Sequence, residues 1–365
     1  MKSVRKIPGR PRPTAGGFAA LLACIAVLSV SAPRAAAQVP AGPDSSSYVF
    51  GDAAKDVLMA DLVGFGLTFS TVGLNFLGSL ALGADGEYGI RDQILSSSIT
   101  ELSSINLFVA GSPDAVALTL AGGALLGGEW IAAEAGGLYS RGQQWFYWAK
   151  NNLAMFKSYD AYAAIRERSM AWGDDGFSRR GALELLAQPF NPDRYAEPLL
   201  WGAVGVTLAT VAGQWALSPE PSATSPFKTG EWYLGEERRS PVVYWLSHSL
   251  YFLSGNALGA LGEEGVYRGV LHEELARALG GPTATLVDSG LFAGMHLATD
   301  LARGLDWKQI LVHVAGVTVN NVIFDLAYER GGLPAAVAAH AAANFAGNIL
   351  ASFLYAGVPS IRLTN

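Results

Sequence analysis

Residues 331–361 read GGLPAAVAAHAAANFAGNILASFLYAGVPSI, a stretch of 31 residues without Asp, Glu, Lys or Arg. A helix needs about 20 predominantly apolar residues to cross the hydrocarbon core of a bilayer. This stretch is long enough, and its small residues let neighbouring helices pack closely in lipid. It therefore predicts a transmembrane helix, around which other helices of the chain must pack.

Other uncharged stretches predict those further helices. They hold between 14 and 23 residues and lie at 62–84, 115–128, 198–219 and 241–262. Two weaker apolar segments carry one aspartate each, at 278–299 and 309–328. A helix inside a bundle tolerates such a residue where it faces protein or water. The predicted fold class is all-α, a polytopic transmembrane helix bundle.

Composition agrees with a membrane protein. Charged residues make up only 15% of the 365 residues, against about 25% in a typical soluble domain, and the mean hydropathy is +0.26. The net charge of −6 argues against a nucleic-acid partner. Cys24 is the single cysteine, so the chain cannot form an intrachain disulfide.

The first 37 residues are typical of an export signal. Basic residues come first, an apolar stretch follows at 17–30, and Ala35, Ala36 and Ala37 supply the small residues of a cleavage site before Gln38. An uncleaved first membrane anchor is the alternative. The signal predicts an integral membrane protein of a bacterial cell envelope, in the inner membrane.

Polar stretches suggest the domain organisation. Residues 142–193 are the least membrane-like part and predict interfacial or extramembrane helical structure. A Pro- and Ser-rich loop at 218–240 ends in a charged cluster and marks a boundary. We therefore expect a signal peptide at 1–37, an N-terminal membrane and interfacial helical region at 38–235, and a C-terminal membrane core at 236–365.

The sequence EEGVYR at 263–268 follows directly on the uncharged stretch 241–262. On a helix, Glu264 and Arg268 lie at i and i+4 and can pair. Glu263 points about 100° away and is then the less neutralised carboxylate, a candidate general base. Taken alone, the cluster could equally be an ordinary ion pair at the end of a helix.

Two further motifs place histidines inside apolar helices. In FAGMH, Phe292 lies one turn before His296; in HAAAN, His340 and Asn344 share one helix face. Taken alone, the first motif could be a buried histidine whose hydrogen bonds are made within the core. The second could serve hydrogen bonding between helices. Those explanations weaken when the three clusters are taken together, because all three clusters lie within 82 mostly apolar residues.

The three motifs, in this order, resemble the pattern EExxxR, FxxxH, HxxxN or HxxxD of the CPBP family. This family includes the type II CAAX prenyl endopeptidases and the bacteriocin-processing and ABI proteins. The resemblance covers about residues 244–353 and implies a CPBP-like core with an intramembrane site. It implies that Glu263 and His296 activate water, that His340 and Asn344 stabilise the oxyanion, and that Glu264 and Arg268 organise the site.

The function expected from this resemblance is an intramembrane endopeptidase, a hydrolase acting on a membrane or envelope peptide. Its partners are then the lipid bilayer and a peptide or protein substrate. A CAAX substrate is not expected in a bacterial envelope. The alternative is a non-catalytic membrane scaffold or a bacteriocin-immunity-type protein with the same bundle.

Metal dependence stays open at this point. A divalent metal such as zinc would take Glu263, His296 and His340 as ligands, and family members are often described as metalloproteases. The chain lacks the HExxH spacing that places two ligands on one helix, which favours hydrolysis without tightly bound zinc. Outside the motifs, we expect an interhelical bond for His248, an interfacial position for His272 and a place near the cavity for His313.

Overall fold

The structure is a computed structural model, and it describes residues 99–136, 141–168, 179–217, 232–234, 237–303 and 305–354. The predicted signal peptide and the predicted helix at 62–84 lie outside these residues. The described part is helical apart from one short antiparallel ribbon, β1 (Tyr233–Leu234) with β2 (Glu237–Arg238). The all-α prediction is therefore confirmed.

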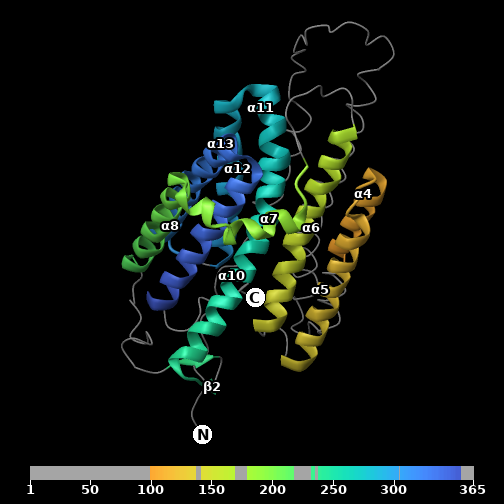
Figure 1. Cartoon of the computed structure of the whole chain (residues 1–365). Helices are drawn as coiled ribbons and strands as arrows, with labels where there is room; N and C mark the ends of the chain where they lie inside the picture. Colours follow the sequence, from red (N-terminus) through yellow and green to blue (C-terminus); the bar gives the residue numbers. More distant parts are fainter. Residues whose placement is uncertain are drawn as a thin grey trace, which may run out of the picture.

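The elements follow one another in a simple order (Figure 1). The first half holds η2 (Ile99–Leu102), α4 (Ser103–Ala110), α5 (Ala115–Gly136), α6 (Arg141–Arg168), α7 (Ala182–Ala187), η4 (Gln188–Phe190), η5 (Pro192–Ala196) and α8 (Pro198–Ala216). After the ribbon come α10 (Pro241–Val266), the π-helical turn η6 (Tyr267–His272), α11 (Glu273–Leu279), α12 (Gly281–Arg303) and α13 (Trp307–Leu354).

Helices α5, α8 and α13 have the length and composition to cross a membrane. The 19 residues of α8 span about 28 Å, close to the thickness of a hydrocarbon core. Large apolar side chains on several helices point outward rather than into the bundle, among them Leu120, Ile131, Trp201, Leu250 and Leu286. Lipid is the environment that suits such a surface, so the chain is an integral membrane protein.

The 48 residues of α13 form two helices rather than one rod. A straight helix of that length would be roughly 72 Å long, about twice what a bilayer needs. Gly332 has φ 66° and ψ −171°, and Pro334 follows it. Phe324 and His340 lie on opposite sides of this break, yet their rings stack with centroids 4.6 Å apart. The chain therefore folds back at Gly332 into a helical hairpin.

Helix α8 packs against both arms of this hairpin. A Cβ atom on Gly316 would lie 2.0 Å from Oγ1 of Thr210, and one on Gly347 would lie 2.5 Å from Cγ2 of Thr207. Asn320 also donates a hydrogen bond of 2.7 Å to Oγ1 of Thr207. Glycine at these two positions lets α8 approach both arms closely.

Helix α10 and the turn η6 that continues it present a face of glycines to α6. Positions 255, 259, 262, 265 and 269 are glycines that recur every three or four residues, and each faces a side chain or backbone atom of α6. The closest approach is at Gly262, where an added Cβ would lie 2.3 Å from the backbone oxygen of Asn152. Small residues at this spacing allow close helix contact in membranes. The α6–α10 contact therefore fixes the helix that carries the EEGVYR motif.

Helix α6 is bound to α5 and to the 3-10 turn η2 by ion pairs. Lys150 Nζ lies 2.6 Å from Glu129 Oε2 and Lys157 Nζ lies 2.6 Å from Glu101 Oε2; both lysine side chains are buried. Buried charges such as these need their partners, because an unpaired ion in the interior is costly. The prediction of helical structure at 142–193 is confirmed for α6, and its placement at an interface stays a prediction.

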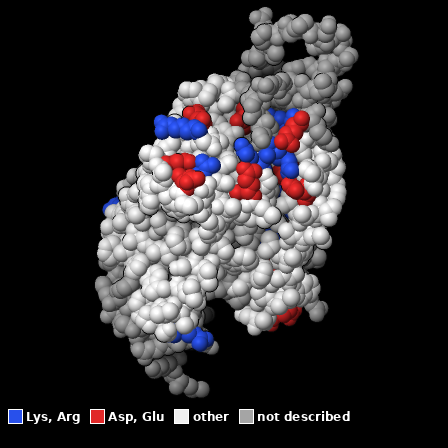
Figure 2. Space-filling model, viewed as in Figure 1, with Lys and Arg blue, Asp and Glu red and all other residues white. Residues whose placement is uncertain are grey.

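Charges on the visible surface lie mainly toward one end of the bundle (Figure 2). A few lie at the opposite end, and the belt between them shows almost none. Beside α7, Arg179 bonds the carboxylates of Asp114 and Asp160. Burial lowers the pKa of Arg179, but these two carboxylates outweigh burial and raise it above its ordinary value. An uncharged belt between two charged ends matches a membrane-spanning bundle.

We predict that Gly262→Ala destabilises the protein by about 1–3 kcal/mol, because its Cβ would meet backbone atoms that cannot rotate away. The control is Gly205→Ala on α8, where no atom lies within 4 Å of the added Cβ. Alanine is the better helix former by roughly 0.5–1 kcal/mol, so the control should keep or gain stability. Thermal unfolding in detergent measures both; equal midpoints for the two variants would contradict the packing assigned to Gly262.

Candidate active site

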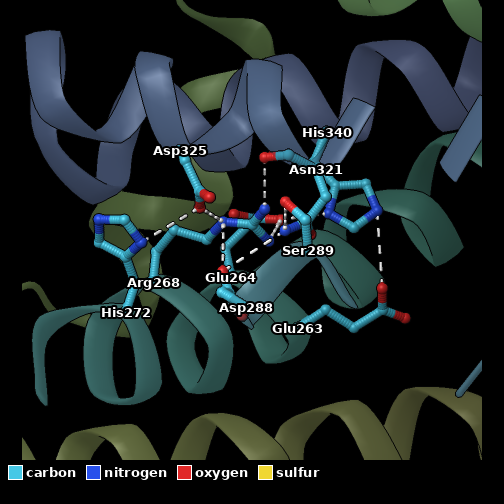
Figure 3. Close-up of polar contacts among 9 residues, drawn as sticks. All are labelled: Glu263, Glu264, Arg268, His272, Asp288, Ser289, Asn321, Asp325 and His340. Atoms are coloured by element: carbon cyan, nitrogen blue, oxygen red, sulfur yellow. Dashed lines mark hydrogen bonds and ion pairs between the residues drawn. The ribbon is translucent and has the colours of Figure 1, made fainter. Parts of the chain in front are cut away.

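Arg268 lies at the centre of a buried polar cluster (Figure 3). Its Nη1 donates to Glu264 Oε1 at 3.1 Å, its Nε to Asp325 Oδ1 at 2.9 Å, and its Nη2 to the backbone oxygen of Asn321 at 2.9 Å. Asp288 Oδ2 is 3.9 Å from Nε. The predicted pairing of Glu264 with Arg268 is confirmed, and the guanidinium also joins α10 and η6 to α12 and α13.

The π-helical turn η6 and two aromatic rings position this arginine. π-Helical turns are rare and occur mostly at functional sites, and η6 carries Arg268 at its second position. The guanidinium carbon lies 5.6 Å from the ring centroid of Phe292 and 5.5 Å from that of Phe324. These distances allow cation–π attraction from both rings. Arg268 is therefore fixed by packing as well as by its carboxylates.

Glu264 connects Arg268 to His340. Its Oε1, which accepts from Arg268, also lies 2.5 Å from His340 Nδ1. The other ring nitrogen, Nε2, is 3.6 Å from Glu263 Oε2. The His340 ring stacks on Phe324. Glu264 is thus fully buried in a network, whereas the Glu263 side chain is partly exposed, at 25%. The two adjacent glutamates have different environments.

His296 joins the site through Phe292. The Phe292 ring centroid lies 4.7 Å from that of His296 and 6.1 Å from that of His340. Nδ1 of His296 is 2.9 Å from the Phe292 carbonyl oxygen. A carbonyl can only accept, so Nδ1 carries the proton and the neutral ring keeps a lone pair on Nε2. That lone pair is available to accept a proton or bind water.

His313, which we expected near the cavity, lies beside His296 with ring centroids 5.7 Å apart. Its Nδ1 is 2.5 Å from Oδ2 of the buried Asp300. His313 is therefore a neighbour of a catalytic candidate, and its place at a cavity stays a prediction. Asn344 follows His340 by one helical turn and is half-buried.

Two other histidines lie elsewhere. His248 donates to the carbonyl of Tyr244 in its own helix, at 3.1 Å, and stacks on the Tyr244 ring. His272 is buried in the bundle with its Nδ1 3.5 Å from Asp325 Oδ1, and its position at a membrane interface stays a prediction. A π-helical turn shifts the register of the side chains that follow, and η6 ends at His272.

The catalytic candidates do not form a ready metal site. Among the described residues, one group of three His, Asp or Glu side chains has its ligand atoms close enough together to hold an ion, and it is His272, Asp288 and Asp325. Glu263, His296 and His340 are not such a group.

Sequence reasoning left several members of the cluster unassigned. Asp288, Asn321 and Asp325 are fully buried around Arg268, and Asn321 donates to Ser289 Oγ at 3.0 Å. The available signal was a lone aspartate in each of the two weaker apolar segments, 278–299 and 309–328. An ionisable residue inside a membrane helix is expected to face a partner in the bundle, and both aspartates do.

Residues 245–346 match the family model "Type II CAAX prenyl endopeptidase Rce1-like". The C-terminal part of the chain is an Rce1-like domain. All six candidate residues fall within it, and the Rce1-like family, which is part of the CPBP family, is a family of proteases. No curated protein and no solved structure matches the chain. The predicted family resemblance is confirmed.

We predict that Arg268→Met lowers the free energy of unfolding by about 3–5 kcal/mol, because it leaves buried carboxylates without their cation. The matched control is Arg180→Met, which removes an arginine from an exposed i, i+4 pair with Glu184 and should cost less than about 1 kcal/mol. Chemical unfolding in detergent measures both variants. Similar losses for the two would show that the buried network contributes no more than a surface pair.

Proposed function

We propose that the chain is an intramembrane endopeptidase in which Glu263 and His296 activate a water molecule for attack on a peptide bond. The observation that carries this proposal is the difference between the two adjacent glutamates. Glu264 is occupied by Arg268 and His340, whereas Glu263 is partly exposed and faces His340 Nε2 at 3.6 Å. A general base must be able to reach the proton that it removes.

The attacking water would be held between Glu263 and His296. His296 keeps its Nε2 lone pair because Nδ1 donates to the Phe292 carbonyl. Glu263 takes a proton from the water as the oxygen attacks the peptide carbonyl carbon. It then returns a proton to the leaving amine, so the carboxylate is restored after each turnover.

His340 and Asn344 would stabilise the negative oxygen that forms on the carbonyl. The Nδ1–H group of His340 donates to Glu264, and this bond orients the ring so that Nε2 faces Glu263. In the imidazolium form Nε2–H is a donor, and the Asn344 amide on the same helix face adds a second one. Preorganised donors of this kind stabilise a transition state more than a substrate.

The substrate class follows from the setting. A site enclosed by apolar helices receives peptides that enter from the bilayer or its surface, so we expect a membrane or envelope peptide. The export-type N-terminus supports placement in the inner membrane of a bacterial cell envelope. The competing proposal is a scaffold that retains the bundle without catalysis, and the experiments below distinguish the two.

We predict that Glu263→Gln abolishes cleavage while leaving the fold intact, a loss of at least about 10²–10⁴-fold in rate. Mass spectrometry would compare envelope peptides from cells producing the native chain, Glu263→Gln and the surface control Glu184→Gln. Peptides should accumulate uncut with Glu263→Gln alone. Identical peptide profiles in all three strains, with equal protein levels, would favour the scaffold.

We predict that Asn344→Ala lowers kcat by about 10²–10³-fold with little change in KM, because its amide would act on the oxyanion rather than on the bound substrate. Steady-state kinetics on a peptide identified in the envelope comparison measures both constants. An increase in KM at constant kcat would instead assign Asn344 to substrate binding.

A further inference from the structure

The cluster around Arg268 contains more acceptors than donors. Five buried polar atoms in it lack a hydrogen-bond partner, and each can act as an acceptor: Glu264 Oε2, His272 Nδ1, Asp288 Oδ1, Asn321 Oδ1 and Asp325 Oδ2. Unsatisfied acceptors are costly in an apolar interior. The atoms that would satisfy all of them must carry positive charge or donate hydrogen bonds.

The charges of this cluster do not balance either. Glu264, Asp288 and Asp325 have fully buried side chains, and Arg268 is the cation that they share. Three carboxylates against one guanidinium leave two negative charges. The imidazoles that contact these carboxylates are His340, on Glu264, and His272, 3.5 Å from Asp325. The catalytic proposal charges His340, and Glu263, 3.6 Å from its Nε2, offsets that charge. A divalent cation bound by an uncharged His272 would therefore neutralise the remaining excess.

We propose that His272, Asp288 and Asp325 bind a divalent transition-metal cation beside Arg268. Their ligand atoms all lie within 4.8 Å of one another, and all three residues are at least nine-tenths buried. Arg268 binds Asp325 through Oδ1 and approaches Asp288 Oδ2, which leaves the other oxygen of each carboxylate for the metal. Asn321 Oδ1 is a candidate fourth ligand.

The donor set indicates the class of metal. One imidazole nitrogen with two carboxylates suits zinc, manganese or iron better than magnesium or calcium, which prefer oxygen ligands alone. Bond lengths of about 2.0–2.2 Å require the ligand atoms to draw together slightly from their present separation. Binding would therefore tighten the contacts among the three elements that supply them.

The proposed cation has a structural role. It connects η6, α12 and the first arm of α13, one ligand from each. The catalytic candidates Glu263 and His296 are not ligands, so hydrolysis needs no metal-bound water. The cation would position Glu264 and His340 through Arg268. This separates a metal requirement for folding from the chemistry of peptide cleavage.

Sharing a proton is the other way for this cluster to reduce its charge. Asp288 and Asp325 lie within hydrogen-bonding reach of each other when one of them is protonated. One proton removes a single negative charge and supplies a single donor, so it leaves acceptors unsatisfied. The two explanations make opposite predictions for chelation, for added zinc and for the Asp288→Asn variant.

Full-length protein in detergent is tested by thermal unfolding, with chelator and with added zinc or manganese, and by elemental analysis. We expect about one metal ion per chain and a midpoint that rises by several degrees when zinc is added. In chelator, Asp288→Asn should be at least as stable as the native protein, because it removes a buried charge. With zinc added, the native protein should be more stable than Asp288→Asn. In His272→Gln the unfolding midpoint should no longer rise with zinc, although the substitution leaves the number of buried carboxylates unchanged.

The matched controls are Glu263→Gln and His296→Gln, which should keep full metal binding and the full zinc response. Metal lost from these controls and retained in Asp288→Asn would overturn the proposal and assign the ion to the catalytic candidates. A native protein that binds no metal and is stabilised only by lowering the pH would also overturn it, in favour of the shared proton. Both readouts are independent of cleavage activity, so a failed protease assay leaves this test unaffected.

Discussion

The Arg268 guanidinium joins three parts of the bundle because each of its nitrogens donates to a different group: Glu264, Asp325 and the Asn321 backbone oxygen. A lysine has no planar fork and could not reproduce this arrangement. Glu264 is held against His340 by the same network, and Glu263, next in the chain, is left to face the other nitrogen of that ring. The different environments of the two glutamates therefore originate in one buried cation.

The Rce1-like domain depends on helices that lie outside the matched residues 245–346. Its α10 has a glycine face that only a closely packed helix can cover, and α6 covers it; its α13 hairpin packs against α8. Helices α6 and α8, which belong to the described part of the N-terminal region, therefore complete the packing of the candidate catalytic core, a role that the sequence did not indicate. The boundary near residue 236 remains a prediction about sequence organisation, and in packing terms the two sides are continuous.

Local spacing explains what could be predicted. The uncharged stretches predicted membrane helices, and the i, i+4 spacing predicted the Glu264–Arg268 pair. Both predictions succeed because they depend only on residues that are neighbours along one helix. The partners from α12 and α13 could not be predicted in the same way. Asp288, Asn321 and Asp325 reach Arg268 because η6, α12 and the first arm of α13 pack together in space. The contact between His272 and Asp325 could not be predicted either, because the π-helical turn changes the helical register and no spacing rule signals such a turn.

The break at Gly332 has a consequence for how the chain enters the membrane. The first arm of α13 carries Asp325, seven residues before the break, and a charged residue inside a lone apolar helix opposes insertion. The second arm has no charged residue, and the exposed Glu329 and Arg330 lie next to the turn between the arms. We therefore expect the translocation machinery to insert the two arms as one unit. The favourable insertion of the uncharged second arm then offsets the cost of inserting Asp325. Arg268, made earlier in synthesis, is already present to receive it.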